Sequence, residues 1–365
     1  MKNYWFLVFY ISILLLGCKD KPIEPNGNGN NYDPRNISRN SGNSYGADIA
    51  VDALGNLHVV WHDETTGNWE ILYSTKPSGG SWSTPVNISN SSNSSFGAEI
   101  ALDLSGNIHV VWAEFLGSFD QIFYSLKPSG VNWSTPVNIS NSSDFANQPR
   151  LGVDGNENVH VIWTGGGRGW YSSKPPGGAW SVPAEYRANL NPALAVEANG
   201  NLHVVFEAAG NNEIYYHFKP SGDTWATPVN ISNKPGYSSG PDIAVSLSGD
   251  VYVVWFERFE GIAYYTVKSA GDSLFGTPVA IPSVTYHPEI AVDSDNTLHL
   301  VWDVAGEVYY SKKPAGGGWS SSINISNTLE YSELNHPPVI IGGVPQIVWQ
   351  DESPGNYDIF YDTVP

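Results

Sequence analysis

Apolar and polar residues alternate in short runs along most of the chain, which is the pattern of half-buried β-strands. The run at 56–61 reads Asn-Leu-His-Val-Val-Trp, and related runs return at regular intervals. Seven copies recur about every 43 to 51 residues, a period typical of propeller blades. The copies lie at 56–61, 107–112, 158–163, 201–206, 250–255, 297–302 and 345–349.

Each copy is predicted to contain four strands. In the first copy they are residues 48–52, 57–61, 70–74 and 84–89, with turn residues between them. Four short antiparallel strands per repeat form one blade of a propeller. The pattern therefore predicts an all-β, seven-bladed β-propeller of four-stranded blades.

The two ends of the repeat array complement each other. The last copy covers residues 338–363 and lacks a fourth strand, whereas residues 33–38 match the fourth strand at 84–89. We therefore expect the N-terminal strand to complete the last blade, which removes the exposed sheet edges of a linear array. The predicted propeller spans residues 32–365.

The N-terminus has the pattern of an export signal. Residues 5–16 form an apolar run that is short for a membrane-spanning helix, and it ends in Leu-Leu-Gly-Cys at 15–18. This ending resembles the bacterial lipobox, which implies cleavage before Cys18 and lipidation of its thiol. The expected organisation is a signal peptide at 1–17, then lipidated Cys18 and a flexible tether at 18–31. The predicted location is the bacterial cell envelope, lipid-anchored at the outer membrane or cell surface.

Composition excludes several partners. The chain carries 17 Lys+Arg against 36 Asp+Glu, a formal net charge of −19. Nucleic-acid binding requires a basic surface that displaces counterions, so no nucleic-acid partner is expected. Direct binding to an anionic membrane surface is disfavoured for the same reason, which leaves the lipid anchor as the expected membrane contact.

A recurrent turn resembles that of a known family. The pattern Ser74-x-Lys76-Pro77-x-Gly79-x-x-Trp82 returns at 125–133, 172–180 and 311–319. It resembles the Asp-box turn of sialidases and related BNR-repeat propellers, although lysine replaces the aspartate and the turn is one residue longer. In that family the turn is a folding element on the face opposite the active site. The resemblance therefore implies the fold and assigns no catalytic role.

Carboxylates recur at the start of the first strand of four blades and after the aromatic residue of the second strands, where they are Asp63, Glu64, Glu114, Glu207, Glu257, Asp303, Asp351 and Glu352. Such a ring could bind a cation such as Ca²⁺, or supply an acid and a base for glycoside cleavage. A solvated acidic rim is the preferred interpretation, and no other cofactor and no metal are expected. The four positions are Asp48, Glu99, Asp242 and Glu289.

Blade three breaks the repeat, and such departures often mark functional sites. Arg150 replaces the carboxylate, the link before its third strand is short, and its fourth strand reads Val-Pro-Ala-Glu-Tyr-Arg at 182–187. Arginine forks suit carboxylate, sulfate and phosphate groups. The candidate ligand-binding residues are Arg150, Arg168, Trp170, Tyr186 and Arg187 in this blade, with Arg258 and Glu257 expected on the same face.

The family resemblance also implies a chemistry to look for. Sialidases hold the substrate carboxylate with three arginines and use a Tyr–Glu pair as nucleophile with an aspartate as acid/base. No Arg-Ile-Pro motif occurs near the first blade, so no catalytic residue is carried over. Aromatic residues before the first strands could stack on sugars if they are exposed, or seal blade junctions if they are buried. These are Tyr45, Phe96, Phe145, Tyr237, Tyr286 and Tyr331.

Three functions remain open from the sequence. The preferred hypothesis is a binding module, with glycan as its expected ligand. The alternatives are a sialidase-like hydrolase or acidic-polysaccharide lyase centred on blade three, and a scaffold for a surface protein.

Overall fold

The computed structural model describes residues 24–25, 31–33, 35–187, 190–234, 236–328 and 330–364. The chain divides into two units, residues 1–34 and residues 35–365. In the first, β1 (Glu24–Pro25) pairs with β2 (Asn31–Tyr32). Cys18 and the predicted signal peptide lie outside the described residues. In the described part of the chain, no helix has the length and apolar character needed to cross a membrane.

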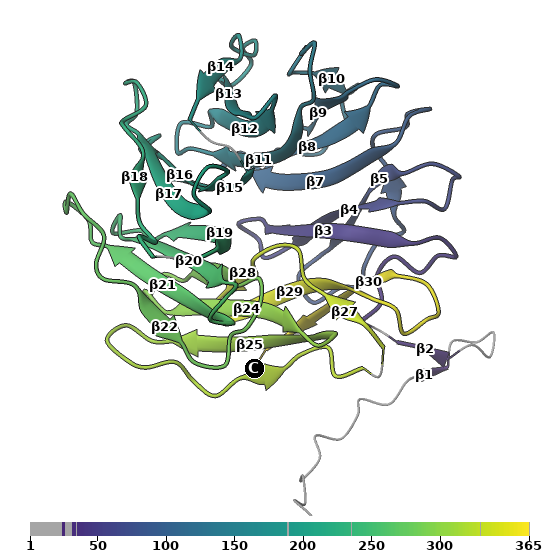
Figure 1. Ribbon diagram of the computed structural model, residues 1–365. Coiled ribbons are helices and arrows are strands. Elements are labelled where there is room, and N and C mark those ends of the chain that lie inside the picture. The colour runs from purple at the N-terminus through teal and green to yellow at the C-terminus, as the bar shows by residue number, and fades with distance from the viewer. Residues whose placement is uncertain are drawn as a thin grey trace, which may run out of the picture. The chain divides into compact units, whose positions relative to one another are not determined.

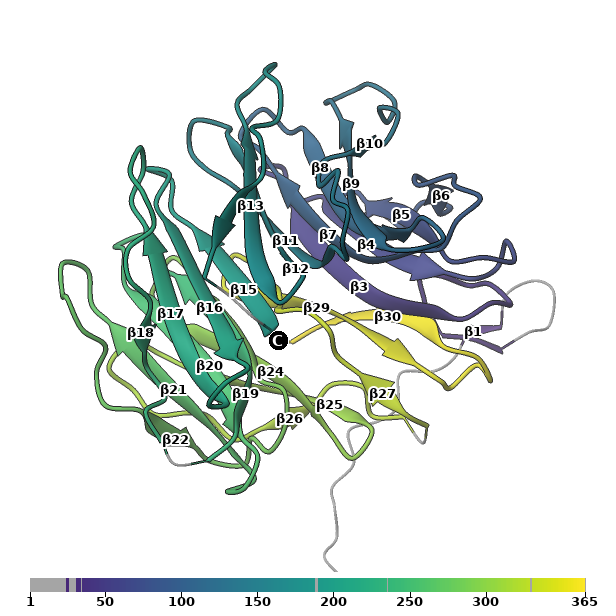
Figure 2. The same cartoon turned by 45° about the horizontal axis from the view of Figure 1, so that its top comes forward.

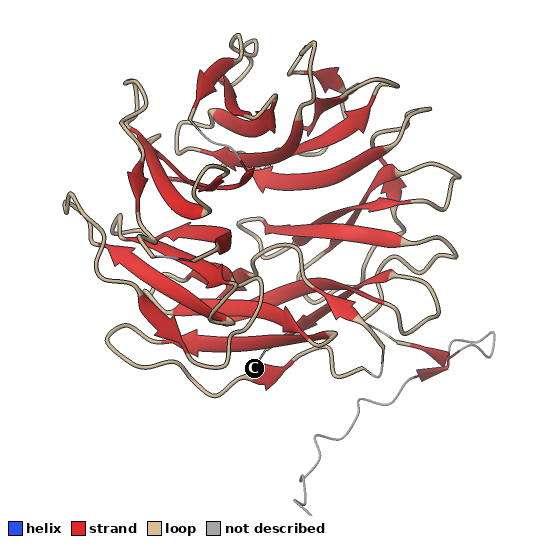
Figure 3. Ribbon diagram, viewed as in Figure 1, coloured by secondary structure: helices blue, strands red, loops and turns tan. Residues whose placement is uncertain are grey.

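The second unit is a ring of seven antiparallel four-stranded sheets, which confirms the predicted seven-bladed propeller (Figure 1; Figure 3). The first strands of successive blades contact one another around the centre of the ring. The links from second to third strands and from fourth strands to the next blade lie on one face, which we call the upper face. The turns from first to second and from third to fourth strands lie on the opposite, lower face.

The seven blades share one strand order. Blade one contains β3 (Ser44–Val51), β4 (Leu57–Asp63), β5 (Glu70–Lys76) and β6 (Val86–Asn87). Blade two contains β7 (Ser95–Leu102), β8 (Ile108–Phe115), β9 (Asp120–Lys127) and β10 (Val137–Asn138). Blade three contains β11 (Asn147–Val153), β12 (Val159–Gly165), β13 (Arg168–Lys174) and β14 (Ala184–Tyr186), and blade four contains β15 (Leu190–Val196), β16 (Leu202–Ala208), β17 (Glu213–Lys219) and β18 (Val229–Asn230).

The later blades follow the same plan until the last. Blade five contains β19 (Ser238–Val245), β20 (Val251–Glu257), β21 (Ile262–Lys268) and β22 (Val279–Ile281). Blade six contains β23 (Glu289–Val292), β24 (Leu298–Val304), β25 (Glu307–Lys313) and β26 (Ile323–Asn324). In blade seven the first strand is broken into β27 (Ser332–Glu333) and β28 (Val339–Ile341), both paired with β29 (Val344–Asp351), which also pairs with β30 (Asp358–Thr363).

The N-terminal segment closes the ring, as predicted. The Ile37 amide donates to the carbonyl of Ile359 at 2.7 Å, and the Tyr361 amide donates to the carbonyl of Arg35 at 2.9 Å. The Asp358 carboxylate accepts hydrogen bonds from both Asn36 and Ser38, each at 2.6 Å. Figure 2 shows β29 and β30, in yellow, beside β3 of blade one, in purple.

Repeated aromatic residues form the core and the seams between blades. The tryptophans at the end of the second strands are at most 1% exposed. Near the fourth strands, a second set of rings meets a tyrosine of the preceding blade edge-on, as Trp133 does with Tyr73 at a centroid distance of 5.1 Å. The same contact recurs at five further seams, so both repeated aromatic sets are structural. These pairs are Trp82–Tyr361, Trp180–Tyr124, Trp225–Tyr171, Phe275–Tyr216 and Trp319–Tyr265.

The repeated histidines of the second strands are also structural, as expected. His109 Nδ1 lies 2.8 Å from the hydroxyl of Tyr124, and its Nε2 lies 3.1 Å from Asp103. Burial lowers the pKa of this imidazole, so the ring is neutral near pH 7. Asp103 also accepts the backbone amide of Asn107 and thereby caps the turn.

The Asp-box-like turn has its own stabilising contacts. Ser74 donates to the carbonyl of Ser83 at 2.9 Å, which ties the start of the turn to its end. The ammonium group of Lys76 lies 5.7 Å from the ring centroid of Tyr361 in the neighbouring blade, a cation–π contact. The lysine that replaces the family's aspartate therefore bridges two blades.

Candidate functional site

A β-bulge in the first strand leads into the residue that faces the centre of the ring. In five blades the pairing register shifts just before this position. Bulges of this kind re-aim the following side chain. In three of these blades the bulge contains a glycine with positive φ, at Gly46, Gly97 and Gly240.

Blades three and four replace that glycine with an amide side chain. Gln148 has φ 51° and Asn191 has φ 46°, a backbone region that costs free energy for residues other than glycine. The Gln148 side-chain amide donates to the Asn191 side-chain oxygen at 2.7 Å, across the boundary between the blades. Thr164 donates to the Gln148 oxygen at 3.2 Å. The bulges of blades three and four therefore present two mutually bonded amide side chains where the other blades have glycine.

A cavity of about 730 Å³ opens beside these residues on the upper face. We call it the inner cavity. Blades one, two, three, four and seven all contribute to its walls. Amide and hydroxyl groups, two phenylalanines, two histidines and one arginine are among the side chains that surround it: Asn147, Gln148, Thr164, Asn335, Phe96, Phe145, His62, His336 and Arg150.

Charged residues form a ring at this level of the channel, which we call the carboxylate ring. Its members are Asp48, Glu99, Asp242 and Glu289. Each of them pairs with the valine that precedes the repeated tryptophan of the second strand. Arg150 occupies the equivalent position in blade three. Its guanidinium lies 2.7 Å from the Glu99 carboxylate, and its side chain remains 33% exposed. The sequence had placed these five side chains in equivalent positions, and the structure brings them together.

The carboxylate ring takes up protons more readily than isolated carboxylic acids. Burial raises the pKa of Glu99 to about 8; the ion pair with Arg150 opposes this shift, and the negative charge of Asp48 adds to it. Burial also raises the pKa of Asp48 to about 7, although hydrogen bonds from two backbone amides favour its ionised form. The pKa values of Asp242 and Glu289 are also raised, and burial is the largest cause for each.

Arg150 keeps its charge in this setting. Burial lowers its pKa, but the surrounding carboxyl groups outweigh that effect and raise it. His336 responds in the opposite direction: burial and the positive charge of Arg150 lower its pKa to about 3, so its imidazole is neutral. Arg150 is therefore the permanent cation of the inner cavity, and the carboxyl groups of Asp48 and Glu99 beside it are partly protonated near pH 7.

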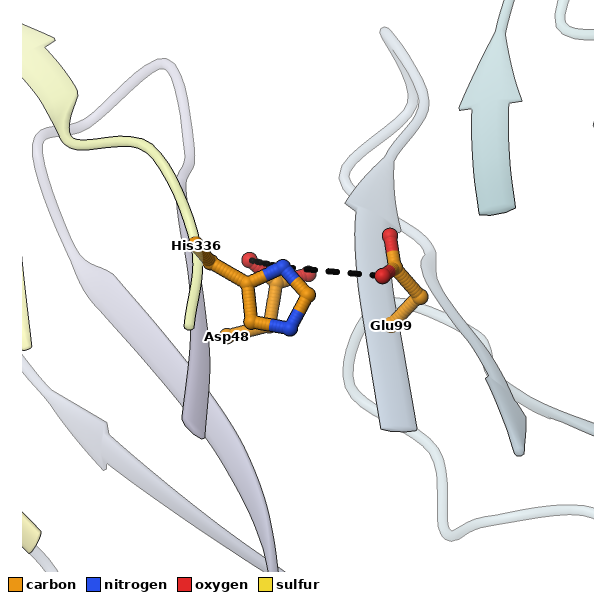
Figure 4. A group of neighbouring side chains, drawn as sticks. All are labelled: Asp48, Glu99 and His336. Carbon is orange, nitrogen blue, oxygen red and sulfur yellow. Dashed lines mark ion pairs between the residues drawn. The ribbon is translucent and has the colours of Figure 1, made fainter. Parts of the chain in front are cut away.

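Three of these side chains could in principle hold a metal ion. Asp48, Glu99 and His336 place ligand atoms within 4.8 Å of one another (Figure 4). However, Arg150 already pairs with Glu99, and both Asp48 oxygens accept backbone amides, from Ile49 and Ile100. Because the guanidinium supplies the positive charge, the arrangement favours an internal ion pair over a cation.

His62 lines the same cavity from blade one. Burial lowers its pKa to about 4, with Asp63 opposing the shift. Its Nδ1 is buried and has no hydrogen-bond partner in the described part of the chain. The neutral ring carries its proton on one of its two nitrogens, so it can donate one hydrogen bond to a ligand and accept another.

The other candidate residues of blade three lie further from the channel. Arg168, Tyr186 and Arg187 line a separate cavity of about 300 Å³ toward blade four, which we call the outer cavity. Tyr186 is buried and stacks on Trp225 at a centroid distance of 4.8 Å. Trp170 donates its indole N–H to the carbonyl of Gly165 and lines a third cavity of about 470 Å³ on the blade-two side.

The two candidates in blade five border neither the inner nor the outer cavity. Glu257 is buried and accepts hydrogen bonds from Ser238 and from the indole of Trp255. Arg258 is exposed and stacks on Tyr237, with its guanidinium carbon 4.6 Å from the ring centroid. The candidate arginines thus do not meet at one point, and the three-arginine arrangement implied by the family resemblance is not formed by these residues.

The aromatic residues before the first strands divide into two groups. Phe145, Tyr286 and Tyr331 are exposed, whereas the remaining three are half-buried. Among the half-buried residues, Tyr45 packs on Trp69 and Phe96 packs against the core between blades two and three. The half-buried residues therefore seal blade junctions, and only the three exposed residues meet the condition for stacking on a sugar.

Several residues of the inner cavity were not among the predicted candidates. Gln148, and Asn191 to which it is hydrogen-bonded beside the cavity, stand where other blades have glycine, and an alignment of the repeats at this position would have revealed them. Asn335 and His336 lie in the break of the first strand of blade seven, where the repeat is least regular. His62 follows a repeated tryptophan and gives no such signal.

No family model matches this chain, and no curated protein matches it either. Comparison with solved structures does find similar folds. A polysaccharide lyase of family PL25, an ulvan lyase, has a TM-score of 0.61 at 9% identity, covering 90% of this chain and 95% of that chain. The polysaccharide lyase Uly1 has a TM-score of 0.57 at 10% identity, covering 88% and 90%.

A sialidase has a similar fold as well. NanB sialidase from Streptococcus pneumoniae has a TM-score of 0.53 at 10% identity, covering 91% of this chain and 70% of that chain. At these identities the likeness shows the fold alone. The chain is therefore similar in architecture to propellers of both lyases and sialidases.

Proposed function

We propose that the protein binds an anionic glycan in the inner cavity, with a carboxylate or sulfate group of the sugar on Arg150. The observation that carries this proposal is the Arg150 side chain, which is 33% exposed and lines a cavity of about 730 Å³. Arginine can bind such groups with two parallel hydrogen bonds. The amides around it are suited to sugar hydroxyl groups, and the exposed face of Phe145 is suited to a sugar ring.

Two further observations support a glycan over a protein partner. The upper face is hollowed rather than flat, and the cavity has convergent polar groups, as small-ligand sites do. One structure with a similar fold is an ulvan lyase bound to -[GlcA(1-4)Rha3S]-, a ligand that contains a uronic acid. The expected lipid anchor at Cys18 would hold this site at the cell envelope.

Replacing Arg150 tests the proposal directly. We expect Arg150→Ala to weaken binding of acidic oligosaccharides about tenfold or more, because a charge-assisted, two-pronged contact is lost. Arg150→Lys should retain part of the affinity, since it keeps the charge but not the fork. Isothermal titration with uronic-acid and sulfated oligosaccharides measures this, with circular dichroism to verify folding. Unchanged affinity in a folded Arg150→Ala protein would rule out this site.

A second candidate function is cleavage of the bound glycan, and one observation favours it. Glu99 lines the inner cavity, and its raised pKa of about 8 keeps a protonated fraction near pH 7. A carboxyl group in that state can give a proton to a departing glycosidic oxygen. Binding remains the better-supported function, because the low pKa values of His62 and His336, about 4 and about 3, make both of them weak bases.

The cleavage candidate predicts a clear result for Glu99→Gln. If the wild-type protein releases new reducing ends from an acidic polysaccharide, the variant should lose about a hundredfold in rate while still binding. A reducing-end assay with purified protein measures this. A wild-type protein that binds but releases nothing would leave the binding function alone.

A further inference from the structure

The outer cavity is a second place that could receive a negative charge. It measures about 300 Å³, and two arginines, Arg168 and Arg187, stand at its rim. Phe206 and Tyr215 of blade four form its other wall. Tyr186 lines it as well, and this tyrosine is 4% exposed with a hydroxyl that lacks a hydrogen-bond partner among the described residues.

The two arginines lie just beyond the paired part of β13 and β14. Gly169 and Tyr186 form the last pair of these strands, and Arg168 and Arg187 are the next residues at the upper end of blade three. Like charges on adjacent chain segments repel each other. The only ion pair here joins Arg168 to Glu185 at 2.7 Å, and both side chains are more than half exposed; no described carboxylate pairs with Arg187. A bound anion would relieve this repulsion.

The inner and outer cavities adjoin each other at a turn made of glycines. Gly167 lines both of them, and Gly165 and Gly166 line the inner cavity together with the third cavity beside Trp170. The link between β12 and β13 contains two residues, Gly166 and Gly167, both with positive φ. Because this turn has no side chains, an extended ligand can pass over it.

We infer that the ligand is a polyanionic polysaccharide that crosses the glycine turn at 165–167, with one anionic group on Arg150 and another between Arg168 and Arg187. This inference rests on the proposed function and extends it from a single sugar to a chain of several residues. It explains why three of the six arginines of the protein occur in one blade. It also explains why the links and the fourth strand of that blade depart from the repeat.

A length series of oligosaccharides tests the inference. We would measure Kd for oligogalacturonates and chondroitin sulfate oligosaccharides from disaccharide to octasaccharide, against the wild type and the double variant Arg168→Gln/Arg187→Gln. Wild-type affinity should rise with length and then level off. The double variant should lose about tenfold for the longest oligosaccharides and retain wild-type affinity for the disaccharide.

A charge-matched control separates the outer cavity from general electrostatics. Lys312→Gln/Lys313→Gln removes two positive charges from the lower face and should leave every affinity at the wild-type value. Wild-type affinity that does not increase with length, or an equal loss for short and long chains in the Arg168/Arg187 variant, would overturn the inference alone. No binding of any oligosaccharide to the wild type would overturn the proposed function and the inference together.

Discussion

Replacing Ile37 by aspartate should destabilise the propeller by about 4 kcal/mol or more. Ile37 is 1% exposed and packs with Ile49 and Trp61 of blade one and Ile359 of blade seven. A carboxylate there would be buried without a partner at the seam that closes the ring. Chemical denaturation monitored by tryptophan fluorescence measures the free energy of unfolding.

Two control variants give this prediction its specificity. Ile37→Val should cost only about 1 kcal/mol, because it removes one methylene group and adds no charge. Ile88→Asp makes the same change at the equivalent position of blade one, where the fourth strand adjoins its own blade in sequence. Only Ile37→Asp should abolish hydrogen-exchange protection at the amides of Ile359 and Tyr361 before global unfolding. Retained protection there, or a loss below about 1 kcal/mol, would contradict the closure mechanism.

Stability should fall as pH rises from about 6.5 to about 9. The carboxyl groups of Asp48 and Glu99 have folded-state pKa values of about 7 and about 8, above their ordinary values of 3.8 and 4.5. The folded protein therefore holds protons that the unfolded chain has already lost, so raising the pH favours unfolding. The expected loss across this range is about 1–3 kcal/mol, measured as the free energy of unfolding at a series of pH values.

The variant Glu99→Gln should reduce the dependence of the free energy of unfolding on pH, because it removes a buried carboxyl group whose pKa is raised. Glu185→Gln is the matched control, because Glu185 is more than half exposed and stands outside the carboxylate ring. The buried histidines have lowered pKa values and act in the opposite direction below about pH 6.5, so the chosen window excludes them. Equal slopes in the wild type and Glu99→Gln would show that the ring does not control the pH dependence.

The repeat pattern was sufficient to predict the fold and the closure of the ring. Most blades share the same turns, and six seams share the same aromatic contact, so the repeat predicts the same local structure in each copy. The alignment of the copies also placed Asp48, Glu99 and Arg150 at one level, because a position shared by all blades must lie at one radius of the ring.

The candidate site was less accessible to this reasoning, for a physical reason. Alternation along a strand says which residues share a face, but it does not say whether a link between strands covers them. Tyr186 and Glu257 are buried by neighbouring strands, although their neighbours in sequence, Arg187 and Arg258, are exposed. His336 lies in the irregular segment between β27 and β28, which no repeat describes, so its position beside Glu99 could not be predicted.

The N-terminal segment that closes the ring, residues 35–38, has a mechanical consequence. This segment joins the last blade through backbone hydrogen bonds and the Asp358 carboxylate, and the chain continues from it directly toward residue 1. Any tension applied to the N-terminal side is therefore transmitted first to these few bonds rather than distributed over seven sheets. The ring is thus expected to yield under load at one place, between blades seven and one, and the inner cavity borders both of those blades.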